Sequence, residues 1–291
     1  MLRNFHKTFA IAATVAVLST SCGYAKQYEK ITKAGNNYMV AVDTLLDKAE
    51  ELQIDLSSEK LLLNDRDKNQ TLEDYKASKE RDTQMIETIG NIKKHNQYLK
   101  SYFATLRKLA TSKAPEQTKK EIESIANNLQ GVGLRLQKSP LFVTNKSTGS
   151  VLGTIGKLVV SSKIDGVLKE ELEKRNQVIL KELELQEKML KALGDSMNYK
   201  FNEIQKSREQ LLVIDPLIKK EDIPHNLLSE WTQTRKKLFV YRRYIEELNQ
   251  ASSALSQFKG IYAASVKGEV NKTSLDDALR DIEYFLALLG K

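Results

Sequence analysis

Residues 85–110 read MIETIGNIKKHNQYLKSYFATLRKLA, and their apolar side chains recur at steps of three and four. This heptad spacing places them on one helix face and is typical of helices that pack as a coiled coil. The seam consists of Met85, Ile89, Ile92, Asn96, Leu99, Phe103, Leu106 and Ala110. A buried Asn96 would fix the helix register, and an Asn96 facing a wet gap is the alternative that the sequence leaves open.

The same spacing continues through most of the chain and predicts further helices. Seams run over residues 28–52, 122–136, 168–211, 231–262 and 275–289. The longest helix is expected from about Ile164 to Leu212, with a local kink or unwinding at 194–198 where the heptad breaks. An interruption is expected at 57–59, and an exposed or frayed connection over 61–80.

Breaks between these seams carry residues that end helices or form turns. Pro115 suits the first turn of a helix, whereas Ser139-Pro140 stops one. Asp215-Pro216 and Ile223-Pro224 bracket a predicted loop, and 268–272 is a predicted turn. Thr273-Ser274 with Asp277 resembles a capping box at the start of the last helix.

The fold class follows from these patterns. No segment shows sustained period-two alternation, and the chain has only 4 Pro and 13 Gly with 29% charged residues. We therefore expect an all-α protein with little or no β-structure, a single elongated antiparallel helical bundle or coiled coil over residues 28–291.

The first 25 residues have the pattern of a secretory signal peptide. Arg3 and Lys7 precede an uncharged, mostly apolar run over 9–18, and small residues follow before Cys22. The run is too short to span a bilayer, so it predicts export across a bacterial inner membrane.

Leu18-Ser19-Thr20-Ser21-Cys22 resembles the cleavage box of bacterial lipoprotein signal peptides. The resemblance implies a signal peptide at 1–21, acylation of Cys22 as the first mature residue, and a short tether at 22–27. The box departs from the usual pattern, because its leucine lies one residue further from the cysteine. Cleavage after Ala25 is the alternative, giving a signal peptide at 1–25 and a soluble periplasmic or secreted protein.

Charge bears on the partners of the mature chain. The formal net charge is +8, and removal of Arg3 and Lys7 with the signal lowers it by two. A positive balance favours anionic surfaces such as phospholipid head groups, although it also serves solubility. Basic and acidic residues are interleaved, and an exported protein seldom meets nucleic acid, so we expect no nucleic-acid partner.

The sequence contains no recognisable catalytic or metal-binding motif. His95 and His225 are isolated and lack metal-ligand spacing to another His or Cys. The Gly-rich stretch 149–157 lacks the Gly-Lys-Ser/Thr ending of a phosphate-binding loop, because Leu158 follows Lys157. We therefore expect a non-enzymatic protein without cofactor or metal.

Two surface segments are candidates for contact with a membrane or a partner. One is the apolar, small-residue connection at 141–163, with Gly149 and Gly153 allowing close helix approach and with Leu141, Phe142, Val143 and Val159 as contact residues. It would form an interfacial hairpin tip or a tightly packed connection. The other interleaves cations with aromatic residues and suits an anionic surface; its cations are Arg235, Lys236, Lys237, Arg242 and Arg243.

Two functions are consistent with these features. The first is a lipid-anchored interaction or scaffold protein of the cell envelope, which contacts an envelope protein or a membrane surface. Its heptad seams also allow homo-oligomers. The second is a membrane-active protein that inserts the 141–168 segment, similar in layout to the long-helix bacterial pore-forming toxins.

Overall fold

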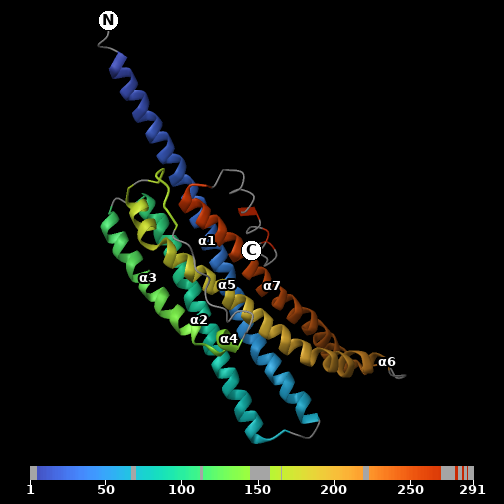
Figure 1. Cartoon of the computed structure of the whole chain (residues 1–291). Helices are drawn as coiled ribbons and strands as arrows, with labels where there is room; N and C mark the ends of the chain where they lie inside the picture. Colours follow the sequence, from blue (N-terminus) through green and yellow to red (C-terminus); the bar gives the residue numbers. More distant parts are fainter. Residues whose placement is uncertain are drawn as a thin grey trace.

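The computed structural model describes residues 5–66, 70–111, 114–144, 158–164, 166–218 and 223–269, with short pieces near the C-terminus, and side chains for most of them from Tyr28 onward. These residues form helices and no strand, which confirms the all-α prediction. The helices are α1 (Phe5–Arg66), α2 (Leu72–Thr111), α3 (Pro115–Gln137), α4 (Pro140–Thr144), α5 (Gly166–Glu209), the π-helix η1 (Gln210–Ile214), α6 (Asp215–Ile218), the 3-10 helix η2 (His225–Leu227) and α7 (Leu228–Lys267). Figure 1 shows them as an elongated bundle.

Two long antiparallel hairpins form the bundle. In the first, α1 packs along α2, and Glu29 near one end pairs with Arg107, whereas Gln53 near the other donates to Asp82. In the second, α5 packs along α7, and Phe201 meets Tyr241 edge to face. The hairpins also contact each other, since Tyr38 Oη of α1 donates to the Ala251 carbonyl oxygen of α7 at 2.6 Å.

Helix α3 runs parallel to α5. The sequence predicted an antiparallel bundle, so this parallel pair is an addition to that prediction. Lys119 near the start of α3 pairs with Glu170, and Gly133 near its end lies against Glu182. The end of α3 and the start of α5 therefore lie at opposite ends of α3. The chain continues from the end of α3 into α4, where Leu141 is buried. At the opposite end of the bundle, the Ser161 N–H donates to the Val266 carbonyl oxygen shortly before α5 begins. The two described ends of the 141–163 connection thus lie at opposite ends of α3.

Most residues of the predicted seams form the core, but Leu211 at the end of the 168–211 seam is 43% exposed. The eight residues of the predicted 28–52 seam are all buried: Tyr28, Ile31, Gly35, Tyr38, Val42, Leu45, Ala49 and Leu52. On α2, the buried seam residues include Ile89, Ile92, Leu99, Phe103 and Leu106. The ring of Phe103 lies edge to face with Tyr102, Phe258 and Tyr262. Gly35 of α1 leaves room for this cluster, because a Cβ there would lie 2.7 Å from Phe258 Cζ.

Asn96 is buried in the seam rather than facing a wet gap. Its Nδ2 donates to the Met39 carbonyl oxygen at 2.7 Å and to Asp43 Oδ1 at 2.8 Å. Both acceptors belong to α1, so one side chain fixes the register of the α1–α2 hairpin.

Several predicted boundaries need correction. Helix α1 continues unbroken through residues 57–59, where an interruption was predicted, and the long helix predicted from about Ile164 begins at Gly166. Residues 194–198 remain α-helical because the shifted seam residues Met197 and Phe201 are both buried. The departure from α-helical geometry comes after α5, in the π-helix η1. The residues from Asp215 onward, predicted as a loop, begin with the short helix α6.

Other helix ends lie where the sequence predicts them. Pro115 begins α3, and Gly268 ends α7 with a left-handed φ of 69°, a conformation that glycine adopts without steric cost. The predicted capping box at 273–277 lies outside the described residues, as does most of the last predicted helix.

Candidate functional site

An open groove runs along the N-terminal half of α7 on the outside of the bundle. Its volume is about 350 Å³, and its lining residues are Trp231, Thr232, Arg235, Lys236, Phe239, Val240 and Arg243. We call it the α7 groove. The lining repeats at steps of one, three and four, which is the spacing of side chains on one helix face. Three apolar residues line it, and Phe239 is 60% exposed.

Trp231 joins the start of this groove to the end of α5. Its Nε1–H donates to the Val213 carbonyl oxygen of η1 at 3.0 Å, and its indole packs partly against the core. Pro216 follows η1 and has no N–H, so the backbone cannot continue the regular ladder of α5 here. The hydrogen bond of Trp231 therefore ties the start of α7 to the π-helix at the end of α5.

Four of the five cations around the α7 groove form no ion pair with a described carboxylate. Between Leu228 and Arg243 the chain has five cations and a single acid, Glu230. Within the described part of the chain, no carboxylate forms an ion pair with Arg235, Lys236, Lys237 or Arg242. Arg235 lies over the Phe239 ring at 5.3 Å, and Arg243 reaches Glu247 Oε1 at 3.6 Å. Elsewhere lysines such as Lys60, Lys119 and Lys259 pair with glutamates on neighbouring helices.

Exposed aliphatic side chains surround the turn that connects α5 with α7. We call them the hairpin tip, and Figure 1 shows α6 at the far end of this hairpin. Ile218 is 69% exposed and Leu217 60%. The other exposed members are Leu211, Ile214, Leu227 and Leu228.

A buried polar trio joins α2 to α5 in the middle of the bundle. His95 is fully buried, with Nδ1 at 2.8 Å from Gln186 Oε1 and Nε2 at 2.9 Å from Glu182 Oε2. Gly133 of α3 makes room for Glu182, because any Cβ there would collide with its carboxylate. His95 and Gln186 have no exposed surface, and Glu182 is 8% exposed.

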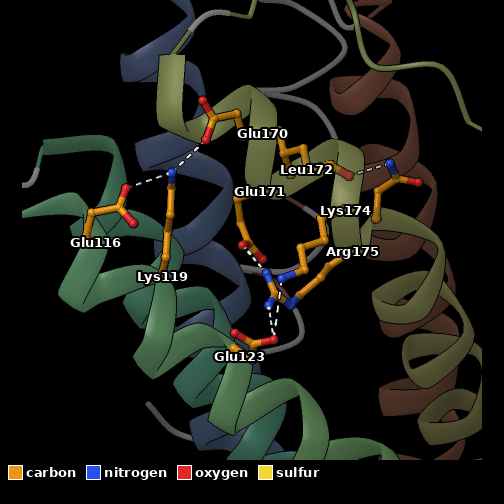
Figure 2. A network of polar contacts seen from close by, with 9 residues as sticks. Glu116, Lys119, Glu123, Glu170, Glu171, Leu172, Lys174 and Arg175 are labelled. Carbon is orange, nitrogen blue, oxygen red and sulfur yellow. Dashed lines mark hydrogen bonds and ion pairs between the residues drawn. The ribbon is translucent and has the colours of Figure 1, made fainter.

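A second buried polar cluster lies between α3 and α5. Figure 2 shows Arg175 between Glu171 of its own helix and Glu123 of α3. Around it, Lys119 and Lys174 form exposed ion pairs between the same two helices. Among the described residues Glu171 Oε1 has no hydrogen-bond partner.

Burial governs the ionisation of this cluster. It raises the pKa of Glu171 from 4.5 to about 7, although Arg175 opposes the rise. Burial and then the Glu171 carboxylate raise the pKa of Tyr102, and burial raises that of Tyr262. The bundle therefore favours the neutral form of these groups.

This shift predicts that the bundle is more stable at mildly acidic pH. The folded state binds a proton at Glu171 that the unfolded state releases near pH 4.5, so stability is complete below that pH and falls until about pH 7. The expected loss is about 3 kcal/mol for a shift of this size. Urea unfolding at about pH 5 and about pH 8 measures it.

Glu171→Gln should remove much of this pH dependence, because glutamine keeps a hydrogen bond to Arg175 without titrating. The matched control is Glu173→Gln, at an exposed position two residues away, which should retain the wild-type dependence. An unchanged dependence in Glu171→Gln would contradict the assignment.

The contact residues predicted at 141–163 lie in different environments. Leu141 is buried and Phe142 packs partly against the core, whereas Val143 and Val159 are 66% and 76% exposed. Gly149 and Gly153 lie outside the described residues. The side chain of Cys22 also lies outside them.

Of the five predicted cations, Arg235, Lys236 and Arg243 line the α7 groove, whereas Lys237 and Arg242 are exposed on α7 outside its lining. The sequence prediction missed the hairpin tip, whose pieces are too short to show a period. It also missed the partners of His95, since Glu182 and Gln186 are 87 and 91 residues away.

Comparison of the chain with protein-family models, with curated proteins and with solved structures finds no match. Within the described part of the chain, none of the helices has both the length and the apolar character needed to cross a bilayer. The same residues contain no group of three or more His, Cys, Asp or Glu side chains suited to a metal ion.

Proposed function

We propose that the protein is a non-enzymatic interaction protein of the cell envelope, exported and anchored by an acylated Cys22. The observation that supports this most is the α7 groove, where apolar side chains lie beside exposed cations on the outside of the bundle, and where Arg235 and Lys236 form no ion pair with a described carboxylate. Such a combination suits a contact with another molecule.

The position of the groove along the bundle suits a protein tethered at its N-terminal side. The α1–α7 pair is antiparallel: Tyr262 lies beside Tyr28, and Tyr241 Oη donates to Asp55 Oδ2 at 2.5 Å. The α-helical rise of 1.5 Å per residue places Asp55 about 40 Å from Tyr28. Arg235 and Lys236 precede Tyr241 on α7, so the groove lies at that distance or further from the proposed tether.

The anchor is tested on the full chain expressed in a bacterial host. We expect the membrane fraction to contain the protein, and mass spectrometry of its N-terminal peptide to show an acylated Cys22. When the membranes are washed at high salt, Cys22→Ala should move the protein to the soluble fraction, whereas the acylated chain should stay with the membranes. An N-terminus at Lys26 without lipid would refute the anchor.

The contact role is tested by placing a photo-crosslinking amino acid at Phe239 of the same chain. The control position is Leu134 on α3, which is 60% exposed like Phe239 but lies away from the groove. We expect crosslinked adducts from position 239 and few from 134. Equal yields from both positions, or none from either, would refute the proposed contact surface.

A further inference from the structure

We propose that the α7 groove and the hairpin tip together bind the surface of an anionic phospholipid bilayer. The inference rests on the contact role proposed above and specifies the partner. It joins two surfaces, one cationic with aromatic residues and one aliphatic, at the same end of the molecule.

The first argument is charge complementarity. Arg235, Lys236, Lys237 and Arg242 are exposed and lack ion pairs with the described carboxylates of this chain. Each cation near an anionic leaflet adds to the attraction, and the attraction weakens within a Debye length. Binding should therefore require anionic lipid and fall as the salt concentration rises.

The second argument is the kind of apolar surface. Phe239 lies between the cations in sequence and Trp231 comes one helical turn before them, an arrangement suited to the bilayer interface, where aromatic rings and basic side chains occur together. Beyond them, Leu217 and Ile218 project from the end of the α5–α7 hairpin with 60% and 69% exposure.

The third argument distinguishes a bilayer from a protein partner. The hairpin tip is spread over η1, α6, η2 and the start of α7, and Figure 1 shows α6 at the outer end of the α5–α7 hairpin. A protein partner would need a matching hollow to cover the tip and the α7 groove together. A bilayer can cover the hairpin tip and the α7 groove without a matching hollow, because lipids rearrange around inserted side chains.

The test uses the purified full chain carrying Cys22→Ala, so that no acyl group contributes to binding. Flotation is measured with vesicles of phosphatidylcholine alone and of phosphatidylcholine with phosphatidylglycerol. We expect binding only to the second, with loss at high salt. No binding to phosphatidylglycerol vesicles, or equal binding to both kinds, would overturn the proposal.

Two variants locate the binding surface. Lys236→Glu with Lys237→Glu should weaken binding to anionic vesicles at least about tenfold, and Leu217→Asp with Ile218→Asp should weaken it by a similar factor. The matched control is Lys94→Glu with Lys120→Glu, which makes the same charge change at exposed positions on α2 and α3. Circular dichroism checks that each variant folds. A control that weakens binding as much as the α7 variant would overturn the assignment to this surface.

The outcome separates the partner from the contact role. If vesicle binding fails while crosslinking at position 239 yields only protein adducts, the bilayer proposal is wrong and the contact surface stands. If vesicle binding and crosslinking both fail, the proposed contact role fails as well.

Discussion

His95→Leu is expected to destabilise the bundle by about 3 to 5 kcal/mol, because it leaves the Glu182 carboxylate buried without its partner. The imidazole lies between Glu182 and Gln186 in the interior, with both ring nitrogens within hydrogen-bonding distance. Leucine matches the apolar surroundings but can bond to neither. Urea unfolding of the full chain at neutral pH measures the change.

A double-mutant cycle separates the lost pairing from the lost packing. Glu182→Met in the His95→Leu background removes the stranded carboxylate, so the double variant should be more stable than His95→Leu alone. His225→Leu is the matched control, because His225 is exposed and its replacement should change stability by at most about 0.5 kcal/mol. Simple additivity of the two single changes would show that the side chains do not act as a pair.

Phe103→Ala is expected to cost about 3 to 5 kcal/mol, the range for deleting a large buried aromatic side chain. The ring is fully buried and lies edge to face with three aromatic neighbours, with centroid distances of 5.1 Å to Phe258 and 5.7 Å to Tyr262. Its removal leaves a cavity where α1, α2 and α7 meet. The loss is measured by urea unfolding.

Phe239→Ala provides the comparison for this second change. Phe239 is the same residue type, 60% exposed on α7, so its truncation should alter stability by less than about 1 kcal/mol. Similar losses at the two positions would contradict the burial of Phe103 in the core.

The bundle could be predicted from sequence because a helix has a single period. The seam from Tyr28 to Leu52 steps by three and four, and each of its members is buried. Pro115 and Gly268 mark helix ends for stereochemical reasons that act within a few residues. Features set by local geometry were therefore predicted well.

Features that depend on neighbours in the tertiary structure were not predicted from the sequence. The partners of His95 belong to a helix that its sequence context cannot identify, and the parallel pairing of α3 with α5 leaves no local pattern. Residues 194–198 show the same limit, because a heptad break predicted unwinding there and packing kept the α-helix intact. Within the candidate site, the sequence pattern identified the α7 cations as contact residues. The aliphatic hairpin tip was recognised only in the structure, because its members come from several short segments around the turn between α5 and α7.

The parallel pairing of α3 and α5 also bears on how the bundle folds. Helices α1, α2 and α3 can pair through short turns as the chain is made, but α5 reaches its place only after the long return from the end of α3. Its ion pair with Lys119 joins residues 51 apart, and Tyr38 meets Ala251 across 213 residues. Contacts of such sequence separation slow folding, because their loops must close before the contacts stabilise the chain. Docking of the α5–α7 hairpin onto a preformed α1–α2–α3 platform is therefore the expected late step of assembly.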